Sequence, residues 1–184
     1  MIQKTDSLVD ELYRVEGKAE IVDGRIVRMN AAGGWHGWVG NKISASLAQH
    51  EETHGGGIAF GDNVGFLVDL PRRKSFSPDA AWMPGSPDDL TLKFIDGAPS
   101  FAVEVRSEND YGPAAEKRIL RKIKDYFAAG TRVVWDVDLL SDDVIKSYRA
   151  ASPDTPQVFR AGDHADAEPA VPNWRFAVKK LVRS

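Results

Sequence analysis

The chain contains no cysteine, which excludes disulfide bonds, thiolate metal sites and a cysteine nucleophile. It also has no apolar run near the roughly 18 residues that a membrane-spanning helix needs. The first 20 residues are mixed and charged, and they show no apolar segment typical of a secretory signal. We therefore expect a cytoplasmic protein that does not associate with a membrane.

An excess of positive charge is also missing. The 24 Lys and Arg against 27 Asp and Glu give a formal net charge of −3, which does not by itself indicate a nucleic-acid binder. Cations are concentrated locally, because five of the eight residues 117–124 are Lys or Arg, and 72–74 reads Arg-Arg-Lys. The overall charge therefore leaves the class of partner open.

The 184 residues, 42% of them hydrophobic and 28% charged, are sufficient for one globular domain over 1–184. Apolar residues at helical spacing predict a short helix over 6–16 and longer helices over 35–54 and 114–129, and glycines follow the two longer segments, where they end a helix. An Asp-Gly turn predicts a hairpin over 19–29. We expect further strands near 57–62, 64–69, 77–83, 99–106, 133–138 and 144–149, then an irregular edge hairpin over 150–173. This order predicts an α/β fold with a mixed central β-sheet flanked by helices.

Two of the expected strands each contain one carboxylate among apolar residues. Asp79 lies in the segment 76–82, and Glu104 lies in the segment 101–107. A buried carboxylate is costly unless it is paired or ligates a metal, and Mg²⁺ prefers oxygen ligands. The two side chains therefore suggest one shared cation and phosphodiester hydrolysis. Alternatively, Asp79 shapes a turn after Pro78, and Glu104 pairs with a buried cation.

The ordered set of motifs resembles the Uma-two family, a group of restriction-type endonucleases in the PD-(D/E)XK nuclease superfamily. The resemblance covers about Ala19 to Val182. It is carried by Ser77-Pro78-Asp79, Val103-Glu104-Val105-Arg106-Ser107, the basic helix and Val134-Trp135-Asp136-Val137-Asp138, and also by Glu20-Ile21-Val22-Asp23-Gly24, His36 and Lys122 with Tyr126.

The resemblance implies a restriction endonuclease-like core and an Mg²⁺-dependent endodeoxyribonuclease that acts on nucleic acid, DNA in particular. It implies that Asp79, Glu104 and the Val105 carbonyl bind Mg²⁺ or Mn²⁺, with Glu20 and His36 as accessory residues. We also expect a homo-oligomer, and specifically a dimer. The alternative is a catalytically silent nuclease-fold protein that binds nucleic acid or a protein partner.

The lysine that the superfamily usually carries two residues after the glutamate is replaced here by Arg106. A guanidinium cannot act as a general base, although it can stabilise charge on a phosphate. The resemblance implies that Lys122 takes the lysine role. Helical geometry places Lys122 beside Tyr126 at the edge of the apolar face, where it can reach towards the sheet.

Each of these residues also has a structural interpretation. Glu20 could pair across the hairpin with Arg28, and His36 could be a surface or capping residue. Lys122 could extend along the helix edge to water, and the basic run over 117–124 could be a solvated helix face. We expect Ser107 and Asp110 to shape the turn into the helix.

Overall fold

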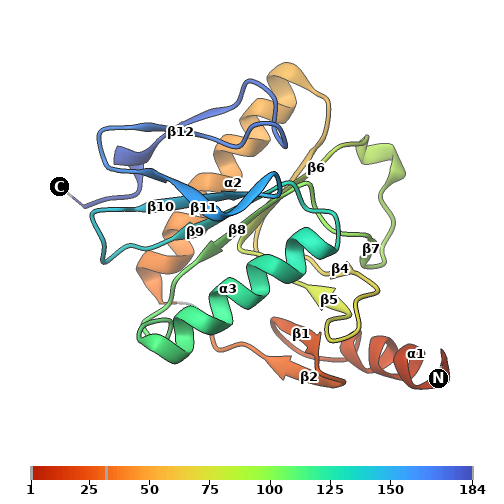
Figure 1. Cartoon of the computed structure of the whole chain (residues 1–184). Helices are drawn as coiled ribbons and strands as arrows, with labels where there is room; N and C mark the ends of the chain where they lie inside the picture. Colours follow the sequence, from red (N-terminus) through yellow and green to blue (C-terminus); the bar gives the residue numbers. More distant parts are fainter. Residues whose placement is uncertain (1, 32, 184) are drawn as a thin grey trace.

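The structure, a computed structural model, describes residues 2–31 and 33–183, with the backbone alone described for 2–6. Its centre is a six-stranded mixed sheet in the order β11-β10-β9-β8-β6-β3 (Figure 1). Strands β8 and β9 are parallel, and the other neighbours are antiparallel. The strands are β3 (Ile58–Phe60), β6 (Ala80–Met83), β8 (Phe101–Val105), β9 (Val133–Val137), β10 (Ile145–Arg149) and β11 (Ser152–Phe159).

Two long helices cover opposite faces of this sheet (Figure 1). Helix α2 (Gly34–His54) packs on one face, and α3 (Pro113–Ala128) packs on the other. Helix α1 (Ile2–Leu12) lies at the N-terminal end of the chain, and two short 3₁₀ turns, Pro87–Asp89 and Val178–Lys180, complete the helical elements of the described residues. In that part of the chain, no helix has the length and apolar character needed to cross a membrane.

Three smaller sheets surround the centre. They are β1 (Ala19–Val22) with β2 (Arg25–Arg28), β5 (Ser75–Phe76) with β4 (Phe66–Leu67) and β7 (Ile95–Asp96), and β12 (His164–Asp166) with β13 (Arg175–Ala177). The β1–β2 turn uses positive φ angles at Asp23 (52°) and Gly24 (69°), as the Asp-Gly signal predicts. Strand β1 is joined to the chain before β5, because the amide of Lys74 donates to the carbonyl of Ile21. This attachment holds the N-terminal hairpin beside the small β5-β4-β7 sheet.

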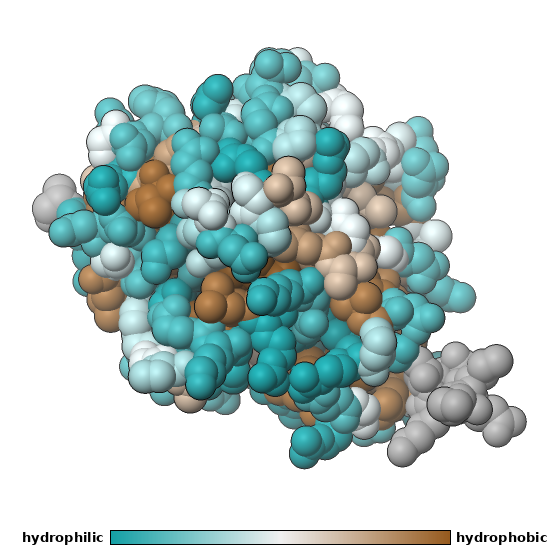
Figure 2. Space-filling model, in the orientation of Figure 1, coloured by the Kyte–Doolittle hydropathy of each residue, from teal (hydrophilic) through white to brown (hydrophobic). Residues whose placement is uncertain are grey.

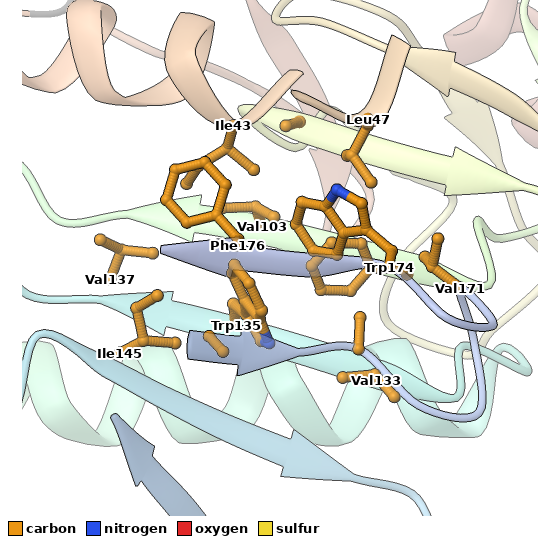
Figure 3. Close-up of a cluster of buried hydrophobic side chains, with 14 of the residues drawn as sticks. Ile43, Leu47, Val103, Val133, Trp135, Val137, Ile145, Val171, Trp174 and Phe176 are labelled. Carbon is orange, nitrogen blue, oxygen red and sulfur yellow. The ribbon is translucent and has the colours of Figure 1, made fainter. Parts of the chain in front are cut away.

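Alternation along the strands creates a separate core on each face. On the α2 side, Val103 and Trp135 pack with Ile43 and Leu47 of the helix and with Trp174 from the C-terminal segment (Figure 3). On the α3 side, the intervening strand residues pack against Ile123 and Tyr126, among others. Period-two strands between amphipathic helices give the mixed α/β sheet that the sequence predicts.

Two boundaries differ from the sequence-based prediction. Helix α1 ends at Leu12 rather than at 16, 3₁₀-type bonds continue only to the Val15 amide, and Gly17 follows with a φ of 86° that suits glycine. The expected irregular edge hairpin over 150–173 is more regular than predicted, because it contains the eight-residue strand β11 despite Pro153 and Pro156. Strand β11 lies at the edge of the sheet, where a missing backbone donor is tolerated.

Candidate active site

Asp79 and Glu104 lie at neighbouring positions on two paired strands. The antiparallel register pairs Ala80 with Val103, so Asp79, just before β6, is opposite Glu104 in β8. The Asp79 amide donates to the Val103 carbonyl (2.9 Å), and the Val105 amide donates to Asp79 Oδ2 (2.7 Å). The Asp79 carboxylate is thereby fixed against the backbone that follows Glu104.

Two cationic side chains approach Asp79 from different elements. Lys18 Nζ, just before β1, lies 2.6 Å from Oδ1, and His36 Nε2, in the first turn of α2, lies 3.4 Å from Oδ2. Helix α2 passes close to Asp79 at Gly40, where an added Cβ would lie in ordinary van der Waals contact with the Asp79 carbonyl oxygen (3.5 Å). Burial alone would raise the pKa of Asp79, but His36 and Lys18 outweigh burial and lower it well below its usual range. Asp79 is therefore ionised at neutral pH.

Glu104 is held by two residues one turn apart on α3. Lys122 Nζ lies 2.8 Å from Oε2, and the Tyr126 hydroxyl donates to Oε1 over 2.6 Å. Burial raises the pKa of Glu104, Lys122 opposes this, and the charges of Asp79 and Glu20 raise it further. The carboxylates thus form one electrostatic group.

Glu20, in β1, is the third carboxylate of this group. Its Oε1 lies 2.9 Å from Lys122 Nζ and accepts a hydrogen bond from the Ser77 amide (2.9 Å), while Oε2 pairs with Arg73. The alternative pairing with Arg28 is wrong, because Glu20 opposes Val27 across the hairpin and turns inward. Glu20 is therefore a second carboxylate partner of Lys122 beside Glu104.

Arg106 is the sequence-predicted site residue that the structure does not bring to these carboxylates. Its guanidinium forms two bonds with Asp136, Nε to Oδ1 (2.8 Å) and Nη2 to Oδ2 (2.7 Å), and it also pairs with Glu116 on α3. The side chain is buried, and the hydrogen bonds to Asp136 and Glu116 raise its pKa. The guanidinium is fully engaged by carboxylates, so the phosphate-binding interpretation loses its geometric basis.

Sequence reasoning missed Lys18, Arg73 and Asp62. Lys18 Nζ lies 2.7 Å from Asp62 Oδ1 as well as binding Asp79, and Arg73 connects Glu20 to Asp125 of α3. These residues belong to segments far apart in the sequence, and no local spacing marks them. The turn prediction was more accurate, because the Ser107 amide and hydroxyl both donate to Asp110 Oδ2.

A cavity of about 350 Å³ opens between the end of α1, the start of β1 and the loop before β7, and its lining residues do not include Glu20, Asp79 or Glu104. Its wall includes Gly17, Ala19, Asn63 and Ser77. Each of these residues lies one or two positions in the sequence from a charged residue of the group or its partners. The stacked rings of Tyr13 and Phe94 line another side. The cavity is thus lined by chain neighbours of the group and not by its carboxylates.

The donor set is compatible with a hard divalent cation. Within residues 2–31 and 33–183, no three His, Cys, Asp or Glu side chains are arranged to hold a metal. Mg²⁺, however, is commonly bound by one or two carboxylates with waters and substrate oxygens. Asp79, Glu104 and the Val105 carbonyl supply ligands of that type, and His36 Nδ1, buried nearby, has no protein partner among the described residues.

Comparison with solved structures identifies the class of fold. The structure resembles the crystal structure of a putative nuclease belonging to DUF820 from Anabaena variabilis ATCC 29413, with a TM-score of 0.72. The match covers 94% of this chain and 96% of that one at 16% identity, so it shows that the two proteins share a fold. The chain itself belongs to the Uma2 family, "Putative restriction endonuclease", whose model matches residues 9–179. No curated protein matches the chain.

Proposed function

We propose that this protein is a metal-dependent nuclease that hydrolyses phosphodiester bonds in nucleic acid, and in DNA specifically. The observation that carries the proposal is the placement of Asp79 opposite Glu104, with Lys122 bound to Glu104. The family supports a restriction endonuclease-like nuclease, and the metal requirement and the substrate are our proposal.

Asp79, Glu104 and the Val105 carbonyl would hold Mg²⁺ or Mn²⁺. A bound divalent ion lowers the pKa of a water ligand and offsets charge on a phosphate. Lys122 has a separate role, which follows from its charge state. Burial alone would lower the pKa of Lys122, but Glu104 and Glu20 outweigh burial and raise it. Lys122 therefore stays protonated, so it positions the attacking water or stabilises phosphate charge rather than acting as the resting general base.

Glu20 and Arg73 are positioning residues in this scheme. Glu20 holds Lys122 in place, and Arg73 neutralises the second Glu20 oxygen and ties it to Asp125 on α3. Lys122 is thus fixed between two carboxylates, which limits its freedom before substrate binds. Such preorganisation is one way that enzymes stabilise charge developing in a transition state.

The outer face of α3 supports a nucleic-acid substrate. The cations of this face are exposed, and Figure 2 shows that the surface over α3 is largely hydrophilic. They are Lys117, Arg118, Arg121 and Lys124. Cations in such a row contact phosphates without reading sequence. We propose that the nucleic acid crosses α3 on its way to Lys122. The homodimer remains a prediction that sedimentation of the purified protein would check.

The decisive experiment incubates the purified protein with supercoiled plasmid, single-stranded DNA or RNA, in Mg²⁺, Mn²⁺ or EDTA. We expect metal-dependent cleavage of DNA, which Asp79→Asn and Glu104→Gln abolish. Asp154→Asn, which alters an exposed aspartate on the edge strand β11, serves as the matched control and should cleave normally. A wild type that binds DNA without cleaving it in either metal would establish the silent-binder alternative. Cleavage of RNA alone would correct the substrate.

A further inference from the structure

Lys18 is placed between two carboxylates of very different exposure. Its Nζ lies 2.6 Å from Asp79 Oδ1 and 2.7 Å from Asp62 Oδ1, and its own side chain is 15% exposed. Asp62, in the turn after β3, has a 51% exposed side chain, whereas Asp79 is buried. One ammonium thus bridges a buried carboxylate of the candidate active site and a solvated carboxylate at its rim.

The two oxygens of Asp79 have separate partners. Oδ2 accepts the Val105 amide and lies near His36, while Oδ1 is bound by Lys18. A divalent cation that binds Asp79 through Oδ1 must therefore share this oxygen with Lys18 or displace it. Two cations that compete for one carboxylate repel one another, and burial strengthens that repulsion.

Lys122 differs from Lys18 in this respect. Of its two carboxylate partners, Glu20 is buried and additionally fixed by Arg73, and the Glu104 side chain is 24% exposed, so neither is as open to water as Asp62. Lys18 has one recessed partner and one partner open to water. If it leaves Asp79, Lys18 can keep a complete ion pair with Asp62, so its departure does not strand a buried charge.

We propose that Lys18 and a divalent cation compete for Asp79, and that Asp62 holds the Lys18 ammonium when the cation binds. This inference rests on the proposed function for the identity of Asp79 as a metal ligand. It adds that Lys18 and Asp62, which are not themselves ligands, set the metal affinity. Lys18 lowers that affinity, and Asp62 restores part of it by offering the lysine a second partner.

The test is calorimetric titration of Mn²⁺ into wild type, Lys18→Met, Asp62→Asn and the double variant, without nucleic acid. Lys18→Met should bind Mn²⁺ roughly tenfold more tightly, as expected when a charged hydrogen bond no longer competes. Asp62→Asn should bind it roughly threefold more weakly, the size of an exposed ion pair. The double variant should bind Mn²⁺ with the same affinity as Lys18→Met alone, because Asp62 acts through the lysine.

Lys74→Met is the matched control, because Lys74 also pairs with an exposed aspartate, Asp69, and its loss changes the net charge equally. Its Mn²⁺ affinity should equal that of wild type. Lys18→Met binding no more tightly than Lys74→Met would overturn the competition. If Asp62→Asn weakens Mn²⁺ binding equally in the presence and absence of Lys18, Asp62 acts on the metal directly, either as a ligand or through its charge. That result would overturn the role assigned to Asp62.

Failure of the underlying metal site would look different. If wild type and every folded variant bind no Mn²⁺, the proposed function fails together with this inference. If all bind Mn²⁺ with one affinity, the metal site stands and only the competition fails. Should Lys18→Met not fold, Asp62→Asn alone carries the test, since its side chain is half exposed. Unchanged Mn²⁺ affinity in that variant would overturn the inference.

Discussion

Glu104 and Asp136 occupy equivalent places on neighbouring strands and have different surroundings. They are register partners on the parallel strands β8 and β9. Helix α3 contributes Lys122, which pairs with Glu104, and Glu116, which pairs with the Arg106 bound to Asp136. Asp136 faces the forked guanidinium of Arg106, and its side chain is 2% exposed. Glu104 meets the single ammonium of Lys122 and the Tyr126 hydroxyl, and its side chain is 24% exposed.

Asp136 belongs to a structural ion cluster, whereas Glu104 lies in a site suited to chemistry. The planar guanidinium engages both oxygens of Asp136, and it stays protonated at any accessible pH. Through Glu116, the same group ties β8 and β9 to the first turn of α3. An ammonium is a compact point charge, which leaves the partly exposed Glu104 able to accept a further ligand. Cation type and access to water, more than strand position, distinguish the two carboxylates.

The largest effect is expected from breaking the Arg106 cluster. Arg106→Ala leaves Asp136 buried without its partner, so the free energy of unfolding should fall by about 3–5 kcal/mol. Urea denaturation would measure this loss, and Asp154→Asn provides a control at an exposed aspartate. Unchanged stability with lost cleavage would contradict the structural role and restore the phosphate-binding interpretation.

Changing Lys122 tests the other half of the comparison. Lys122→Met should reduce cleavage roughly 100-fold, the usual cost of removing one group that stabilises transition-state charge. Its unfolding free energy should fall less than that of Arg106→Ala, because Glu20 retains Arg73 and the Ser77 amide. Lys124→Met, on the exposed side of the helix, should leave the cleavage rate in low salt nearly unchanged. Equal losses of cleavage rate in both variants would mean that α3 acts only as a surface that attracts phosphates.

A smaller effect should be visible in the pH dependence of stability. The hydrogen bond to Asp79 raises the pKa of His36 against the opposing effect of burial. The stabilisation from charged His36 is therefore fully present below its unfolded pKa of about 6.5, and it is lost as pH rises through the raised folded value. Thermal unfolding from pH 5 to 9 should show wild type and His36→Gln converging as pH rises. A constant difference would mean that His36 does not titrate in this range.

Local signals in the sequence predict much of the fold. The Asp-Gly turn, the glycines after α2 and the period-two strands each depend on neighbouring residues, and the structure contains these elements. Helical spacing also predicts that Lys122 reaches the sheet, as observed. The edge position of β11 was also predicted, but its regular eight-residue length was not, because its prolines argue against a regular strand unless its place in the sheet is known.

The ion partners could not be predicted in the same way. One carboxylate in an apolar strand singled out Glu104, but the same signal describes Asp136, which pairs with Arg106. Distinguishing the two requires knowing which cation reaches each strand, and that depends on packing between distant segments. Lys18 and Arg73 belong to such segments, so their roles emerge only in the folded chain.

The long-range contacts that join the N-terminal hairpin region to the rest of the chain have a consequence for when the site forms. Lys18 contacts a residue 61 positions along the chain, and Glu20 bonds the Ser77 amide 57 positions along. Closing loops of this length costs chain entropy that short-range contacts do not require. During synthesis, Lys18 and Glu20 emerge long before Lys122, so the charge constellation is incomplete until α3 has left the ribosome. A chain that ends before α3 therefore lacks Lys122, the cation that joins Glu20 to Glu104.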